Sequence, residues 1–315
     1  MLVRPRHLAP GDTLGIISPA SAAPDWKAVE RAIARLERLG FRIKLAPNVR
    51  KRRGFLAGTD RERASDLVRM FTDKQVDAVM CVRGGYGTAR LLPKLDYDII
   101  RANPKIFVGF SDITSLHCAF LTKSKLISFH GPMLVSDFSN TDMPEFTLES
   151  FLETLSGERV DLCEGYVGNT VKTLRRGVAR GQLIGGNLAL LCTVIGTPWQ
   201  PSFKGRILFL EDVGELPYRF DRMLTHLLNA GLLQQLGGIA IGLNADCEDP
   251  KAAIAKECRQ TLDDVMRERL LPLKIPVVSG LPFGHVPCNA TLPVGIMATL
   301  DATRGTLRAE ESCVG

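Results

Sequence analysis

The sequence has few of the residues that build metal or redox centres. Its 315 residues include five histidines, two tryptophans and eight cysteines, and no two cysteines have C-x-x-C spacing. Zinc sites and thioredoxin-like sites use such pairs, so we expect neither a metal nor a redox motif. Cys81, Cys118 and Cys192 stand inside apolar strand or helix patterns, where thiols pack as small hydrophobic groups. This usage is typical of a reducing compartment.

Long apolar runs are also missing. No stretch approaches the roughly 18 apolar residues of a membrane-spanning helix, and residues 1–6 lack the apolar core of a secretion signal. We therefore expect a cytoplasmic protein without membrane contact. The formal net charge is only +6, and aromatic residues do not interleave with the one dense basic cluster, Arg50–Arg53. No nucleic-acid partner is predicted.

The first part of the chain alternates strand and helix patterns. Apolar runs predict strands at 14–18, 41–45, 77–82, 106–110 and 126–129. Helical spacing predicts helices over 25–39, from the capping box of Thr59 and Glu62 onward, and over 112–123. This repetition predicts a parallel sheet covered on both faces, with ligands beyond the carboxyl ends of its strands.

A polar segment, 137–160, separates this part from a second set of α/β signals. Strands are expected at 178–184, 206–210 and 238–243, helices at 187–195, 218–228 and 251–270, and a hairpin from 294–300 and 305–309. We therefore predict an α/β protein with an N-terminal domain at 1–136, a connecting segment at 137–176 and a C-terminal domain at 177–315.

Ser111 stands where the apolar run 106–110 meets the helical pattern of 112–123. A serine at such a corner exposes its Oγ beside the first helical N–H groups, which suits a nucleophile and an oxyanion site. Gly109 relieves crowding there, but Ile113 stands where the G-x-S-x-G motif has its second glycine. The alternative is a helix cap, with Asp112 placed favourably at the helix N-terminus.

A serine nucleophile needs a base, and two of the five histidines are credible. His130 ends the strand that follows the Ser111 helix, and His285 lies in a loop between strand-like runs. The residues alone leave both open. The other three are expected to be exposed, turned away from Ser111 or structural, and they are His7, His117 and His226.

Two further segments carry candidate groups. The strand 206–210 ends in Glu211 and Asp212, so Glu211 could orient the base, or the acids could cap a helix or lie at a solvated strand end. The glycine-rich turn 84–87 does not have the G-x-G-x-x-G spacing of dinucleotide sites. Its exposed N–H groups suit an oxyanion site beside Ser111, and a plain tight turn is the alternative.

Seven short segments follow one another in a specific order. They are 15–21, 55–64, 83–87, 109–112, 185–188, 209–212 and 283–285, with no contribution from 137–160. Together they resemble the LD-carboxypeptidases, a family of serine peptidases that also contains the microcin self-immunity peptidases. The resemblance spans nearly the whole chain.

This resemblance implies a triad of Ser111, Glu211 and His285, and a packing role for His130. It also implies a flavodoxin-like N-terminal domain with a parallel sheet that carries Ser111, and a C-terminal α/β domain with hairpin elements that carries Glu211 and His285. The site would then lie at the domain boundary, a common place for pockets.

Two further roles are hypotheses built on this site. The backbone N–H groups of Gly85 and Asp112 would bind the tetrahedral oxyanion. An exopeptidase must also recognise a free carboxylate, and Arg83 with Gly84 at the mouth of the glycine-rich turn would do so.

The family resemblance also implies an activity. Its members are typically cytoplasmic homodimers that release the terminal D-alanine of a murein tetrapeptide, cutting an L-to-D bond without a metal or other cofactor. One alternative is cleavage of a toxic peptidyl-nucleotide by the same triad, although neither Trp26 nor Trp199 is an obvious stacking residue. The other is a non-catalytic peptide or sugar binder, which is usually exported.

Overall fold

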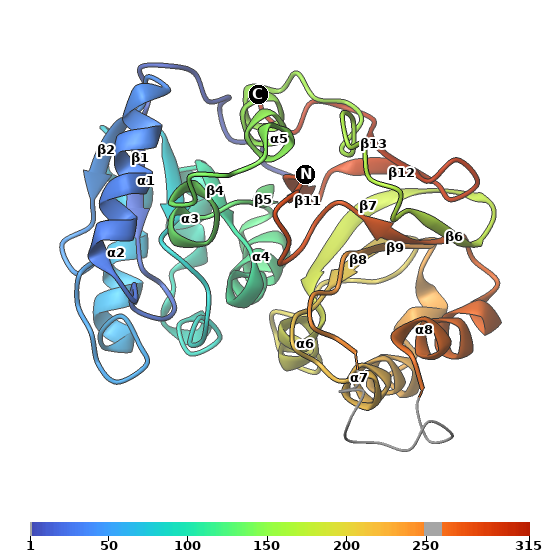
Figure 1. The fold of residues 1–315 in the computed structure, drawn as a ribbon. Helices are drawn as coiled ribbons and strands as arrows, with labels where there is room; N and C mark the ends of the chain where they lie inside the picture. The colour runs from blue at the N-terminus through green and yellow to red at the C-terminus, as the bar shows by residue number, and fades with distance from the viewer. Residues whose placement is uncertain (1, 249–259) are drawn as a thin grey trace.

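The computed structural model describes residues 2–248 and 260–315. Two β-sheets lie side by side, and helices pack against each of them (Figure 1). The first half of the chain, blue to green, forms most of the sheet on the left, and the second half, yellow to red, forms the sheet on the right. None of the helices in the described residues has the length and hydropathy needed to cross a membrane.

The first sheet has six strands in the order β11-β5-β4-β3-β1-β2. The strands are β1 Thr13–Ile17, β2 Arg42–Leu45, β3 Ala78–Cys81, β4 Ile106–Gly109, β5 Ser128–His130 and β11 Leu292–Val294. β1 to β5 pair in parallel, and their order is that of flavodoxin-like folds. The associated helices are α1 Trp26–Arg38, α2 Asp60–Thr72, α3 Tyr97–Ala102 and α4 Thr114–Ala119.

Local sequence signals explain where these helices begin. The Asp25 side chain accepts a hydrogen bond from Lys27 N at 2.9 Å and caps α1. The predicted capping box of Thr59 and Glu62 is confirmed at the start of α2, where each residue's side chain accepts from the other's backbone N–H. Both helices therefore start where the sequence predicted.

The second sheet has seven strands in the order β13-β12-β7-β8-β9-β10-β6. They are β6 Lys172–Arg175, β7 Val178–Asn187, β8 Ile207–Glu211, β9 Gly238–Gly242, β10 Val277–Leu281, β12 Met297–Asp301 and β13 Thr306–Ala309. β7 to β10 are parallel, whereas β6, β12 and β13 pair antiparallel to their neighbours. The helices are α6 Leu188–Val194, α7 Pro217–Asn229 and α8 Leu262–Leu270, and residues 251–259 of the predicted last helix lie outside the described part.

One prediction of local structure needs correction. Val294 does not begin the C-terminal hairpin, because β11 ends there and Gly295, with a φ of +104°, turns the chain before β12. The segment predicted as a connection contains helix α5, Glu145–Ser156, and strand β6. Helix α5 buries Phe146, Phe151 and Leu155 on one face. The many polar residues of 137–160 made this apolar face difficult to recognise in the sequence.

The second half of the chain also returns to the first sheet. β11 pairs antiparallel with β5, so that Leu292 lies opposite His130. Figure 1 shows β11 beside β5, at the edge of the first sheet. The boundaries at 136 and 177 stay a prediction, and the pairing of β11 links the two halves through backbone hydrogen bonds.

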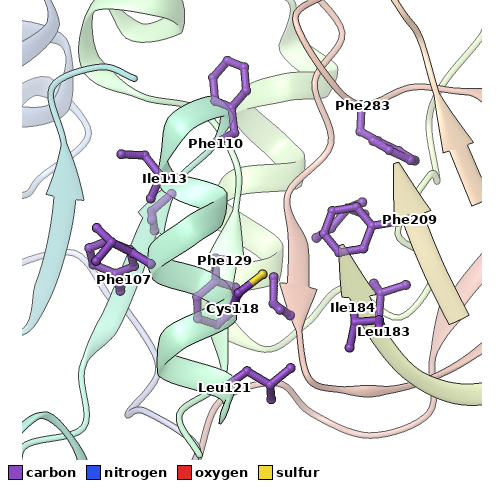
Figure 2. Packing of buried hydrophobic residues seen from close by; sticks show 14 of the residues in the cluster. Phe107, Phe110, Ile113, Cys118, Leu121, Phe129, Leu183, Ile184, Phe209 and Phe283 are labelled. Carbon is purple, nitrogen blue, oxygen red and sulfur yellow. The ribbon is translucent and has the colours of Figure 1, made fainter. Parts of the chain in front are cut away.

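Buried side chains fill the space between the sheets (Figure 2). Phe110 follows β4 on one side, and on the other side Phe209 lies in β8 and Phe283 follows β10. The rings of Phe209 and Phe283 pack edge to face with centroids 5.8 Å apart. The interface between the two halves is therefore an apolar core.

Candidate active site

Three strands of the first sheet end at the edge where the candidate residues lie. The loop after β1 contacts the glycine-rich turn after β3, because Tyr86 N donates to Ser21 Oγ at 3.1 Å. That turn lies against Ser111, which follows β4. A Cβ added at Gly84 would stand 3.1 Å from Ser111 Oγ and 3.3 Å from Asp112 N, so only glycine allows this close approach.

Ser111 has an unusual backbone conformation. Its φ is +65°, in the left-handed region that non-glycine residues rarely adopt. It begins a short 3-10 turn, η2 (Ser111–Ile113), that leads into α4, and the residue that caps this turn is Phe110. The geometry therefore differs from the helix-cap alternative. Strain of this kind is common at functional sites, where the surrounding structure holds the residue in place.

The side chain of Asp112 ties the Ser111 corner to the glycine-rich turn. Its Oδ2 accepts from Thr88 N at 2.8 Å, and the Thr88 hydroxyl donates to its carbonyl oxygen. Burial raises the pKa of this carboxyl, and the bonds from Thr88 oppose that rise. Within residues 2–248 and 260–315, the N–H groups of Gly85 and Asp112 donate to no protein acceptor. Both remain free to bind a ligand oxygen.

Arg63 supports the same turn from α2. Its guanidinium is buried, pairs with Asp60 at 2.7 Å and donates to the carbonyl of Gly87 at 2.9 Å and to that of Pro19. One side chain therefore joins α2 to the loops after β1 and β3.

Glu211 and His285 form a hydrogen-bonded pair in the second half of the chain. His285 Nδ1 lies 2.7 Å from Glu211 Oε2, Glu211 is fully buried at the end of β8, and the His285 side chain is 21% exposed. Gly284 allows this approach, because a Cβ there would lie 3.0 Å from Glu211 Oε2. Burial lowers the pKa of His285, but the hydrogen bond and charge of Glu211, with the charges of Asp212 and Asp137, outweigh it, so the pKa lies above 6.5.

The neighbouring acid has a different role. Asp212 accepts from Asn187 Nδ2 at 2.8 Å and from Ala189 N at 2.9 Å, so it stabilises the start of α6. Burial raises its pKa to about 6. The sequence suggested that these acids orient the base or cap a helix. In the structure Glu211 contacts His285, and Asp212 caps α6.

Contacts between the two halves bring Ser111 and the Glu211–His285 pair to the same region. Asn187 N donates to Thr114 Oγ1 at 3.0 Å, three residues after Ser111, and Asn187 lies opposite Glu211 in the β7–β8 register. The ring of Phe110 packs on the ring of His285 with centroids 4.9 Å apart. The residues before and after Ser111 therefore both contact the region of the pair.

The loop that carries His285 is held by α5. Gly284 N donates to Asn289 Oδ1 at 3.1 Å, and Asn289 N donates to Thr147 Oγ1 at 2.9 Å. The Thr147 hydroxyl in turn donates to the carbonyl of Pro287 at 2.7 Å. Both Thr147 and Asn289 are fully buried, so this network fixes the position of His285.

The other histidines lie in different environments. His130 is fully buried against the rings of Phe110 and Phe209, and neither of its ring nitrogens has a hydrogen-bond partner in the described residues. Burial lowers its pKa well below 6.5. His117 bonds to Ser128 Oγ and the Gly109 carbonyl, and burial lowers its pKa to about 4. The two that remain, His7 and His226, are exposed.

Arg83 is half-buried at the start of the glycine-rich turn. Its guanidinium forms no ion pair within the described residues, and Arg83 Nη2 would lie 3.7 Å from a Cβ at Gly85. A cation free of protein partners therefore stands beside the free amide of Gly85. No group of three or more metal-ligating side chains gathers in the described part of the chain.

Sequence reasoning missed the residues that support the site. Ser21, Arg63 and Asn187 belong to the segments that resemble the family. The sequence therefore marked these positions, but it did not indicate what their side chains do. Thr147 and Asn289 lie outside those segments, and their hydrogen bonds depend on contacts between residues more than 130 positions apart.

An α/β fold of this topology, with a serine on a strained corner and a carboxylate–histidine pair from the second half of the chain, is typical of serine hydrolases. Comparison with known proteins makes the class more specific. The family model of the LD-carboxypeptidase N-terminal domain matches residues 14–131, and that of the LD-carboxypeptidase C-terminal domain matches residues 180–300. The chain belongs to the LD-carboxypeptidase family, and it is an enzyme of the serine LD-carboxypeptidase type.

Individual relatives cover nearly the whole chain. A Bacillus subtilis protein named "Probable murein peptide carboxypeptidase" is 37% identical over 96% of this chain and 93% of its own length. The crystal structure of muramoyltetrapeptide carboxypeptidase from Oxalobacter formigenes is 34% identical, with a TM-score of 0.80 over 94% of this chain and 97% of its own. The microcin C7 self-immunity protein of Escherichia coli is 30% identical over 93% of this chain and 92% of its own length. A solved structure of a microcin C7 self-immunity protein is 27% identical, with a TM-score of 0.90 over 99% of this chain and all of its own.

Proposed function

We propose that this enzyme releases the terminal D-alanine from a murein tetrapeptide, with Ser111 as nucleophile, His285 as base and Glu211 as the group that orients the base. The observation that carries the proposal is the buried Glu211–His285 pair packed against Phe110, the residue that precedes Ser111. The murein peptides named for two of the relatives supply the substrate class.

The reaction follows from these positions. Nε2 of neutral His285 takes the proton of Ser111 Oγ, which attacks the carbonyl carbon before the terminal D-residue. Glu211 accepts from Nδ1, keeps that tautomer and stabilises the imidazolium. The N–H groups of Gly85 and Asp112 bind the oxyanion, and losing one such donor typically costs about 10²–10³ in rate.

Collapse of the tetrahedral intermediate breaks the peptide C–N bond. Nε2–H of His285 protonates the departing amine, which leaves as free D-alanine, and the remaining peptide stays bound to Ser111 as an ester. Water then attacks the ester with His285 again as base, and Ser111 recovers its proton. Arg83, assisted by the backbone of Gly84, binds the free carboxylate that distinguishes a terminal residue from an internal one.

Two properties of the working enzyme belong to the same proposal. The family resemblance favours a homodimer in the cytoplasm, with a murein peptide rather than a nucleic acid as ligand. Light scattering on the purified protein tests the dimer, and cell fractionation tests the compartment.

The experiment is D-alanine release from a tetrapeptide ending in D-alanine, measured for the wild type and for Ser111→Ala. The variant should lose at least about 10³-fold in kcat with an unchanged melting temperature, because it removes the bond-forming atom. Retained turnover would end the serine mechanism.

A pair of histidine substitutions tests the assignment of the base. His285→Ala should lose turnover to a similar degree. His130→Phe should keep most of it, because His130 packs between aromatic rings and neither of its ring nitrogens has a partner. The reverse result would show that His130 is the base.

A further inference from the structure

A cavity of about 500 Å³ lies between α1 and residues 138–141, where the short helical turn η4 (Leu134–Phe138) ends. Phe138 and Leu39 give it some apolar surface. Pockets that hold small molecules typically measure about 300–1,000 Å³, so this cavity is large enough for one. None of the three proposed triad residues lines it. The cavity is therefore distinct from the proposed active site.

Three arginines of α1 line one side of this cavity. Arg31, Arg35 and Arg38 are spaced four and three residues apart, so they share one face of the helix. No aspartate or glutamate lines the cavity, and none of the three arginines forms an ion pair with a described residue. The acids of α1, Glu30 and Glu37, lie roughly a quarter turn or more round the helix from each arginine. The wall therefore has three positive charges and no counter-charge from the protein.

Helix stability explains only part of this arrangement. Arg35 and Arg38 stand in the last turn of α1, where cations interact favourably with the helix dipole. Arg31 lies outside that turn, and like charges at i and i+4 destabilise a helix, so Arg31 and Arg35 repel each other. A bound anion would relieve this repulsion.

The segment opposite the arginines fixes one of them and adds further donors. Arg35 Nη1 donates to the carbonyl of Asn140 at 2.7 Å, which holds this guanidinium at the cavity wall. Neither the backbone N–H nor the hydroxyl of Thr141 donates to an acceptor in the described residues. The cavity is therefore lined by hydrogen-bond donors from two elements.

The chemistry of these donors indicates the class of ligand. Guanidinium groups form bidentate, charge-assisted hydrogen bonds with phosphate oxygens. A phosphate group has a charge near −2 at neutral pH and several acceptor oxygens, so it can bind more than one arginine at once. A single carboxylate has one charge and two oxygens, and it would leave most of the positive charge unpaired.

We propose that this cavity is a phosphate site, in which Arg31, Arg35 and Arg38 hold a phosphate that is either free or part of a small organic molecule. The inference goes beyond the proposed carboxypeptidase function and does not depend on it.

The test measures binding of inorganic phosphate and of glycerol 3-phosphate to the purified protein by isothermal titration calorimetry at pH 8 and low salt. Both probes should bind saturably with a Kd below about 1 mM, and binding should weaken as ionic strength rises. Tighter binding of glycerol 3-phosphate assigns an organic phosphate to the cavity, and tighter binding of inorganic phosphate assigns the free ion. Absence of saturable binding of both probes overturns the inference.

Arg31→Gln combined with Arg38→Gln tests where the anion binds. Both side chains are exposed, so the variant should fold, and its Kd for phosphate should rise by at least about 10-fold because two charged hydrogen-bond donors are lost. The matched control combines Arg42→Gln with Arg61→Gln, which removes the same charge from two exposed arginines that do not line the cavity. The control should keep the wild-type Kd. Equal weakening in both double variants would be an effect of net charge, and it overturns the inference.

Arg83→Gln separates this cavity from the proposed active site, where a phosphate could also bind Arg83 and the free amide groups. This variant should bind both probes like the wild type, and loss of binding would place the anion in the active site and overturn the inference. If the Arg31 and Arg38 double variant has a lowered melting temperature, Arg31→Gln alone gives the answer, with an expected rise in Kd of about threefold or more. An unchanged Kd in that variant overturns the inference. Every arm measures binding, so a failure here is separate from a failure to release D-alanine.

Discussion

Glu211 and Asp212 are adjacent in sequence, and their carboxylates serve different parts of the molecule. Glu211 Oε2 contacts His285 Nδ1, and its Oε1 has no hydrogen-bond partner in the described residues. Asp212 is fully engaged, with bonds from Asn187, Ala189 and Val213. Because successive residues of a strand point to opposite faces, the end of β8 presents one acid to the proposed active site and the other to α6.

This division predicts opposite effects for two substitutions. Glu211→Gln should reduce kcat by about 10³-fold or more, because an amide can hold His285 in the wrong tautomer, and it should change stability little. Asp212→Ala should leave three donors without their acceptor and lower the free energy of unfolding by about 2 kcal/mol or more, with kcat within a few-fold of the wild type.

Steady-state kinetics and urea unfolding of both variants check this pair. A large loss of turnover in Asp212→Ala with unchanged stability would assign the orienting role to the wrong acid.

The pH dependence of turnover should follow the protonation state of His285. Only neutral His285 can accept the Ser111 proton, so kcat/KM should rise with pH as this group loses its own proton. Because the net effect of Glu211 is to raise the pKa of His285, the midpoint of that rise should lie above 6.5.

In Glu211→Gln the hydrogen bond to a charged group and the charge of Glu211 disappear, whereas burial and the charges of Asp212 and Asp137 remain, so the pKa of His285 falls and the residual activity should rise at lower pH. Measurement of kcat/KM from pH 5 to 9 checks both midpoints. A wild-type midpoint below 6.5 would contradict the coupling of the two residues.

At the scale of elements, the site depends on the fit between the glycine-rich turn and the corner between β4 and α4. Thr88 bonds to Asp112, and Arg63 bonds to the carbonyl of Gly87, so both ends of the contact are fixed. The turn and the corner therefore behave as one rigid unit that holds Ser111 at a φ of +65°.

Gly84→Ala should disturb this unit. The added Cβ would stand 2.9 Å from Ser111 Cβ and 3.1 Å from Ser111 Oγ, so Ser111 must move. We expect kcat to fall by about 10²-fold or more, since small displacements of reacting groups have effects of that size.

Gly237→Ala is the control, because its nearest neighbour would lie 3.4 Å away, an ordinary contact. It should keep wild-type kinetics. Hydrolysis assays with a thermal melt of each variant check the comparison, and full activity in Gly84→Ala would show that the turn does not position Ser111.

Elements with strong local signals were predictable from the sequence. Helices α1 and α2 have caps and apolar faces in the expected places, and the parallel strands β3 and β4 are continuous apolar runs. β6 and β10 were missed. β6 is short and mostly exposed, so its pairing with β10 at the sheet edge comes from tertiary contact rather than from pattern.

The candidate site was only partly predictable. Position at strand ends indicated Ser111 and Glu211, but local pattern could not choose between His130 and His285. The difference between them lies in their surroundings, because His285 faces a carboxylate and His130 faces aromatic rings. Spacing in sequence does not contain that information, and the family resemblance supplied it.

At the scale of the whole molecule, the two halves are joined by more than the chain between them. β11 from the C-terminal part completes the first sheet, and α5 bonds to Leu8 and to the loop that carries His285. Phe110 and His130 of the first half pack on aromatic residues of the second. Unfolding of either half alone would expose this shared core and leave β5 as an open edge.

The whole molecule should therefore unfold in one cooperative transition, although chains of this length often unfold in parts. The two tryptophans lie in different halves, since Trp26 is in α1 and Trp199 follows α6, where Thr122 Oγ1 of the first half donates to the Trp199 carbonyl. Trp199→Phe leaves Trp26 to report on the first half, and Trp26→Phe leaves Trp199 to report on the second. Circular dichroism measures how much each tryptophan substitution itself changes the urea midpoint. After correction for that change, the two fluorescence transitions in urea should coincide.

Phe283→Ala, introduced into both variants, should lower both midpoints together by the equivalent of about 3–5 kcal/mol, because the cavity it leaves belongs to the core that the halves share. Two separated transitions, with only the Trp199 signal moved by Phe283→Ala, would mean that the halves are stable independently and that the site forms by docking of two finished domains.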